Sequence, residues 1–145
     1  MFNRRLLAPI VLAVLLALAI SPAAFADEGT KKTEACPTSG LDAIADLIRQ
    51  APSCRRAIAL FESCEFSASG DVALGAAATE KCEGDFLRKL SPAQKRAYDR
   101  SQKLCARKYQ NQDGTMYRSF EAFCGAYVAR DYSAKFLKAA PKGSK

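Results

Sequence analysis

The sequence predicts an all-α fold, a small disulfide-stapled bundle of about five short helices that follows a cleaved signal peptide. Three observations predict this fold class. Every convincing apolar periodicity along the 145-residue chain is helical. An N-terminal export signal precedes all six cysteines, and disulfides form where thiols are oxidised. The chain after the signal has the length of one domain, with neither strand-like alternation nor an internal repeat.

Residues 1–26 have the features of a secretory signal peptide: a basic start, an apolar run over 6–20 and a small-residue cleavage site. We expect cleavage between Ala26 and Asp27 and a periplasmic or secreted protein. A retained anchor is the alternative, but the run has 15 residues, whereas a bilayer span needs roughly 20, so we expect no membrane span in the mature chain. The expected organisation is signal peptide (1–26), flexible polar tail (27–35), helical disulfide-rich domain (36–138) and frayed C-terminal tail (139–145).

Three helices are expected before residue 91, from apolar residues at helical spacing and from turn residues between them. They are a helix of about ten residues after Ser39, a helix from Ser53 to about Cys64, and a helix for which Asp71 is the N-cap. The segment around Pro52 separates the first two. The third is expected to extend through Cys82, Phe86 and Leu90.

The fourth helix has a clear start signal. Ser91 and Gln94 have the spacing of a capping box, and Pro92 occupies the first helical position, where no N–H donor is lost. The helix is expected to end near Tyr109. Its basic residues at i, i+4, i+7 and i+11 place four cations on one face: Arg96, Arg100, Lys103 and Arg107.

The fifth helix begins between Thr115 and Ser119, after a turn at 111–114. Its expected buried face carries Phe120, Cys124, Tyr127 or Val128, and Phe136. The aromatic run Tyr117, Phe120, Phe123 and Tyr127 is interpreted as core packing that holds this helix against the bundle. A ligand-binding stripe is the alternative.

Six cysteines in an exported chain predict three disulfides. Two of them, Cys54 and Cys64, lie on one helix and about 15 Å apart, too far for a bond. In antiparallel helices joined by a turn, residues equally distant from the turn are level with each other. This geometry predicts the pairs Cys36–Cys64, Cys54–Cys82 and Cys105–Cys124. Without histidine or a CxxC pair, we expect no metal site and no cofactor.

Charge is unevenly distributed along the mature chain. Residues 27–85 contain 6 basic and 11 acidic side chains, whereas 86–145 contain 14 basic and 4 acidic ones. The four cations of the fourth helix have two interpretations. One is a solvated outer face, partly neutralised by the acidic first half. The other is a docking surface for an anionic partner, such as phosphate-bearing envelope lipid, an acidic polymer or an acidic protein patch. Nucleic acid is not expected, because an exported domain seldom meets it.

The sequence predicts a protein that is not an enzyme. Histidine, the ordinary general base, is absent, and oxidised cysteines are not nucleophiles. The carboxylates of Glu80, Glu83 and Asp85 lie close in sequence, but their spacing distributes them around a helix instead of across a cleft. We expect them to be solvated surface groups.

The second half of the chain carries a set of spaced residues that resembles a known family. The set consists of Ala93, Gln94, Lys95, Ala97, Tyr98, Arg100, Cys105, Gly114, Thr115 and Cys124. Over residues 91–136 this pattern resembles the LprI-type lysozyme inhibitor domain, although the family usually has a tryptophan and this chain has none.

The resemblance implies a small secreted helical module with paired cysteines that binds a lysozyme or another envelope protein. Common lysozymes are basic, so inhibition would have to use the acidic first half. The alternative function is a structural or stress-associated envelope domain whose basic helix docks on an anionic lipid or polymer surface.

Overall fold

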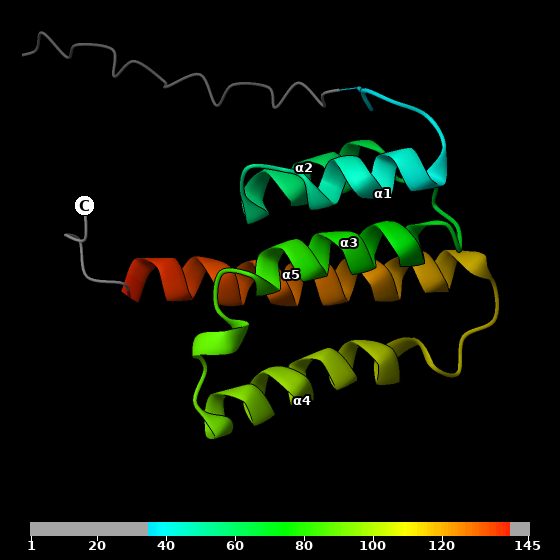
Figure 1. Ribbon diagram of the computed structural model, residues 1–145. Coiled ribbons are helices and arrows are strands. Elements are labelled where there is room, and N and C mark those ends of the chain that lie inside the picture. Colours follow the sequence, from blue (N-terminus) through cyan, green and yellow to red (C-terminus); the bar gives the residue numbers. More distant parts are fainter. Residues whose placement is uncertain (1–34, 140–145) are drawn as a thin grey trace, which may run out of the picture. The chain divides into compact units, whose positions relative to one another are not determined.

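The computed structural model describes residues 35–139, which belong to one compact unit, Thr33–Lys145. Within that range the chain is helical and contains no strand, so the predicted all-α fold is confirmed (Figure 1). The elements are α1 (Leu41–Arg49), α2 (Cys54–Ser63), α3 (Asp71–Glu83), the 3-10 helix η1 (Leu87–Lys89), α4 (Pro92–Tyr109) and α5 (Thr115–Ala139). The predicted signal peptide, its cleavage site between Ala26 and Asp27, and residues 27–34 and 140–145 lie outside the described residues.

The starts of α2 and α4 follow from side-chain caps. The Ser53 hydroxyl accepts a hydrogen bond from the Arg56 N–H at 3.2 Å. At α4 the Gln94 N–H donates to the Ser91 hydroxyl at 3.3 Å, and the Ser91 N–H donates to the Gln94 side chain at 2.9 Å. These two bonds confirm the predicted capping box, and Pro92 is the first residue of the helix.

The start of α3 differs from the prediction. Asp71 is the first helical residue, and Gly70 is the N-cap. The buried Asp71 carboxylate accepts hydrogen bonds from the Phe66 N–H at 2.8 Å and from the Ser119 hydroxyl at 2.6 Å. The side chain therefore joins the preceding loop to α5 instead of capping its own helix.

The end of α3 also differs, because the helix stops at Glu83 and Gly84 is its C-cap. Phe86 and Leu90 consequently lie beyond it. Phe86 is buried in the following turn, where its ring lies 5.2 Å from that of Tyr98 and 5.7 Å from that of Tyr132. The contact of Phe86 with these two later helices is a tertiary interaction that local spacing does not reveal.

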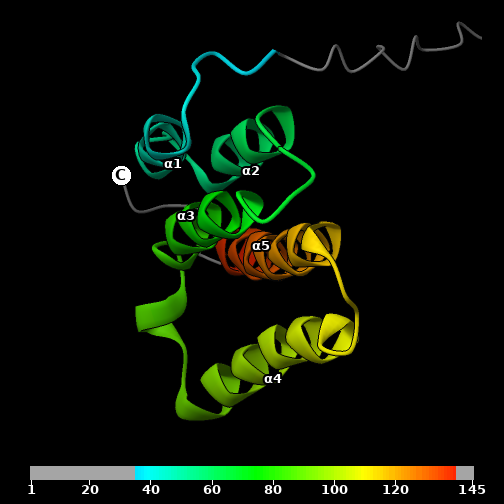
Figure 2. The same ribbon diagram turned by 90° about the vertical axis from the view of Figure 1, so that its right-hand side faces the viewer.

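The helices form three layers. Figure 2 shows α1 and α2 on one side of α3 and α5, with α4 on the other side. α3 contacts α1, α2 and α5, and α4 packs against α5. Asp71 bonds Ser119 near the start of both α3 and α5, and Asp85 bonds Ser133 about four turns later. α3 and α5 therefore run parallel. α4, which lies between them in the sequence, runs in the opposite direction.

Small side chains form the contact between α3 and α5. A β-carbon at Gly75 would lie 2.8 Å from the β-carbon of Ala122, and the buried residues of α5 are Ser119, Ala126, Ala129 and Ser133. The predicted buried face of α5 is therefore correct only in part, because Tyr127, Val128 and Phe136 pack against the core while partly buried, but the residues at the α3 contact are small. Phe123 and Tyr127 pack at the edge of the core, whereas Phe120 is 42% exposed. Bulky rings are excluded from the contact between α3 and α5 because the two backbones approach too closely to accommodate them.

Three disulfides hold the fold together: one joins the segment before α1 to the C-cap of α2, one joins α2 to α3, and one joins α4 to α5. The pairs are Cys36–Cys64, Cys54–Cys82 and Cys105–Cys124, with Cα atoms 4.8, 4.4 and 5.6 Å apart, and no cysteine is free. These are the pairs that the hairpin geometry predicts. Three disulfides in a chain of this size are typical of proteins from oxidising compartments. None of the described helices is long and apolar enough to cross a membrane.

Candidate functional site

The outer face of α4 carries the most concentrated charge among the described helices. Only two residues of α4 are buried, Tyr98 and Cys105. On the opposite face lies the row that we call the basic row: Arg96, Arg100, Lys103 and Arg107. All four side chains are exposed, and among residues 35–139 none of them forms an ion pair or a side-chain hydrogen bond. The structure thus brings together the four residues that helical spacing predicts.

Three carboxylates of the acidic first half bind partners other than the basic row. Glu80 pairs with Arg49 at 3.3 Å. Glu83 accepts a hydrogen bond from the Tyr98 hydroxyl at 2.7 Å, and Asp85 accepts one from Ser133. Each of the three therefore has its own partner among the described residues. Within the described residues they also do not neutralise the basic row by direct contact.

A hydrogen-bond network fixes the orientation of α4. The Tyr98 hydroxyl donates to Glu83 at the end of α3, while the Gln102 amide donates to the Tyr98 oxygen at 2.7 Å and to the Gly125 carbonyl at 3.1 Å. Burial raises the pKa of Tyr98 well above its ordinary value, and the hydrogen bond to Glu83 raises this pKa further. The phenol therefore remains a donor at physiological pH. The network and the disulfide of Cys105 hold the buried face of α4 inward and the basic row outward.

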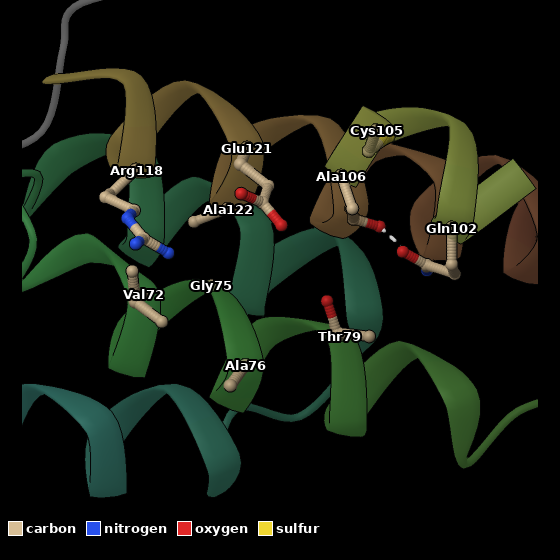
Figure 3. Close-up of a pocket in the computed structure, with 11 residues that line it drawn as sticks. Val72, Gly75, Ala76, Thr79, Gln102, Cys105, Ala106, Arg118, Glu121 and Ala122 are labelled. Atoms are coloured by element: carbon tan, nitrogen blue, oxygen red, sulfur yellow. Dashed lines mark hydrogen bonds between the residues drawn. The ribbon is translucent and has the colours of Figure 1, made fainter. Parts of the chain in front are cut away.

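A cleft of about 190 Å³ lies between α3, α4 and α5. Figure 3 shows Thr79 of α3, Gln102 of α4, and Arg118 and Glu121 of α5 around it. The cleft is smaller than the 300–1,000 Å³ typical of small-molecule sites. Sequence reasoning missed it because its walls come from three helices whose relative placement depends on tertiary packing.

A second hollow, the aromatic groove, lies on α5 beside α4 and has a volume of about 400 Å³. It is lined by Lys108, Tyr109, Phe120, Phe123, Cys124, Tyr127, Val128 and Asp131. The Phe123 ring stacks on Phe61 of α2 at 4.0 Å, and the Tyr127 hydroxyl donates to Glu62 at 3.1 Å. The aromatic run of α5 was visible in the sequence, but the contribution of α4 to the groove was not.

Within residues 35–139 no group of three or more histidine, cysteine, aspartate or glutamate side chains is arranged to hold a metal ion. No protein-family model, curated protein or solved structure matches the chain. The resemblance of residues 91–136 to the LprI-type domain therefore stays a prediction. Its residues have structural roles here: Gln94 completes the cap of α4, Tyr98 joins the network, and Cys105 bonds Cys124.

Proposed function

We propose that this protein is a non-enzymatic binding module of the periplasm or the extracellular space that docks on an anionic partner through the basic row of α4. One observation carries the proposal: the four cations are exposed and have no anionic partner among the described residues. From Arg96 to Arg107 they extend over roughly 16 Å of helix. An array of this length matches a partner with several regularly spaced negative charges.

The basic row is costly for the helix that carries it. Like charges one turn apart destabilise a helix by roughly 0.2–0.5 kcal/mol per pair. α4 is held instead by its capping box, by the Tyr98 network and by the disulfide of Cys105. The result is a preorganised cationic surface whose mutual repulsion an anionic partner would relieve.

Heparin chromatography over a salt gradient tests the proposal. We expect the protein to be retained and to elute with rising salt, because exposed charge interactions are screened. The variant Arg100→Glu with Arg107→Glu should not be retained. The control Arg55→Glu with Lys138→Glu makes the same change in net charge at two other exposed positions and should still be retained. Equal retention of both variants, or retention that is indifferent to salt, would overturn the proposal.

Lysozyme inhibition is the second candidate. It is supported by the resemblance of residues 91–136, in which Gln94 caps α4 and the cysteine pair Cys105–Cys124 joins α4 to α5. A basic lysozyme would be repelled by the basic row, so inhibition should persist or strengthen in the variant Arg100→Glu with Arg107→Glu. A lysozyme activity assay with both proteins distinguishes the two candidates. If neither inhibition nor anion binding is found, both candidates are excluded and a structural domain without a docking surface on α4 remains.

A further inference from the structure

Three large apolar side chains of the α4–α5 hairpin are exposed. Leu104, Met116 and Phe120 are 57%, 47% and 42% exposed. Met116 and Phe120 are four residues apart and share one face of α5. The Phe120 ring also lies 6.0 Å from the rings of both Tyr109 and Tyr117, which places partly buried aromatic side chains behind it. We call Leu104, Met116 and Phe120 the apolar patch.

This apolar patch is continuous with the basic row. Arg100, Leu104 and Lys108 recur at i, i+4 and i+8 and therefore share one face of α4. Arg100 also belongs to the basic row. Lys108 lines the aromatic groove together with Phe120, and its Nζ lies 5.1 Å from the centre of the Tyr109 ring. Cations and an exposed apolar side chain consequently alternate along this face of α4.

Among anionic partners, a bilayer surface matches this arrangement. A soluble polyanion would satisfy the cations and leave Leu104 and Phe120 in water. An anionic bilayer presents phosphates at its surface and hydrocarbon directly beneath them, so it accommodates both kinds of group at once. Tyrosine rings, with an apolar body and a polar tip, are also favoured at this boundary.

We infer, on the basis of the proposed function, that the anionic partner is a lipid bilayer. The basic row and Lys108 bind lipid phosphates, and the side chains of Leu104, Met116 and Phe120 enter the headgroup region. The helices stay folded on the surface and do not span the membrane.

The absence of tryptophan from the chain allows a direct test of insertion. Phe120→Trp places a single tryptophan in the apolar patch, and Leu137→Trp places one at a control site that is 58% exposed near the end of α5. The proteins begin at Asp27, which retains the whole unit Thr33–Lys145 and removes the apolar N-terminal segment, whose own affinity for lipid would interfere. Circular dichroism establishes that each variant keeps its helices.

Phosphatidylcholine vesicles with and without phosphatidylglycerol are the probes. With anionic vesicles we expect a blue shift of the Phe120→Trp emission and quenching by brominated lipid, with neither effect for Leu137→Trp or with heparin. We expect the double variant Leu104→Ser with Phe120→Ser to bind anionic vesicles at least about tenfold more weakly and to elute from heparin as the parent does. The control Leu137→Ser should bind vesicles like the parent.

The outcomes separate this inference from the proposed function. Heparin retention without vesicle binding, or vesicle binding without any change in Phe120→Trp emission, would overturn the bilayer inference and leave the proposed function standing. A protein that binds neither heparin nor vesicles would overturn the bilayer inference and the proposed function together.

Discussion

A β-carbon added to Gly75 of α3 would lie 2.8 Å from the β-carbon of Ala122 on α5. The same position would be 3.1 Å from the Ala122 carbonyl oxygen, so the close neighbours include backbone as well as side chain. This contact sets the distance between the two parallel central helices. Because α4 packs on α5, it also determines where the layer that carries the basic row lies.

Gly75→Ala is therefore expected to destabilise the protein. Alanine has a better helix propensity than glycine by about 1 kcal/mol, but overpacking a tight contact costs roughly 1–3 kcal/mol. We expect the free energy of unfolding to fall by about 1 kcal/mol in urea titrations. Gly70→Ala is the control, because its β-carbon would meet only the ring of the exposed Phe66. A Gly75→Ala variant that is more stable than the parent would contradict the close approach.

Asp71 gives a second prediction, since its buried carboxylate joins Phe66 to Ser119. Asp71→Ala leaves a backbone N–H and a hydroxyl without their acceptor, and the free energy of unfolding should fall by roughly 2–3 kcal/mol. Asp71→Asn should cost less, because the amide can accept from Phe66 and donate to Ser119. Chemical denaturation compares the two variants. Equal losses for both would mean that these hydrogen bonds do not account for the role of Asp71.

Tyr98 makes stability sensitive to alkaline pH. In the unfolded chain its phenol ionises near pH 10, whereas burial and Glu83 keep it protonated in the folded protein. The folded state then binds more protons, so the free energy of unfolding falls as the pH rises above about 10. Between about pH 9 and 11 the parent should lose more stability than Tyr98→Phe. Thermal melts at both pH values provide the comparison, and identical losses would exclude this role of the phenol.

Removal of the Cys105–Cys124 disulfide should loosen α4 selectively. Replacing both cysteines by alanine should lower the free energy of unfolding by about 3 kcal/mol. Because only Tyr98 and Cys105 of α4 are buried, amide hydrogen exchange should accelerate in α4 before it does in α3. Removal of the Cys54–Cys82 disulfide is the matched control and should leave exchange in α4 slow. Uniform acceleration across all helices in both variants would contradict a separately tethered α4.

Local signals in the sequence were enough to predict several features. Ser91 and Gln94 determine the start of α4 because a capping box involves residues within one turn. The basic row could be predicted from the helical periodicity of α4 alone. The cysteine pairs followed from the similar distances of the paired cysteines from the turns between them.

Features that depend on contacts between distant helices were missed. α3 ends at its C-cap Gly84, and Phe86 packs beyond it on Tyr98 and Tyr132. The buried face of α5 is made of small residues because Gly75 of α3 lies against Ala122. Apolar spacing within one helix favours its large side chains and gives no information about the distance to its neighbour.

The central claim is that the basic row of α4 is the surface through which the protein meets an anionic partner. Amide chemical-shift mapping during titration with a heparin-derived oligosaccharide at low salt tests it most directly. We predict that the largest shifts occur on α4 between Arg96 and Lys108, and that they disappear as salt is added. Shifts centred on α1 and α2, or none at any oligosaccharide concentration, would contradict the claim.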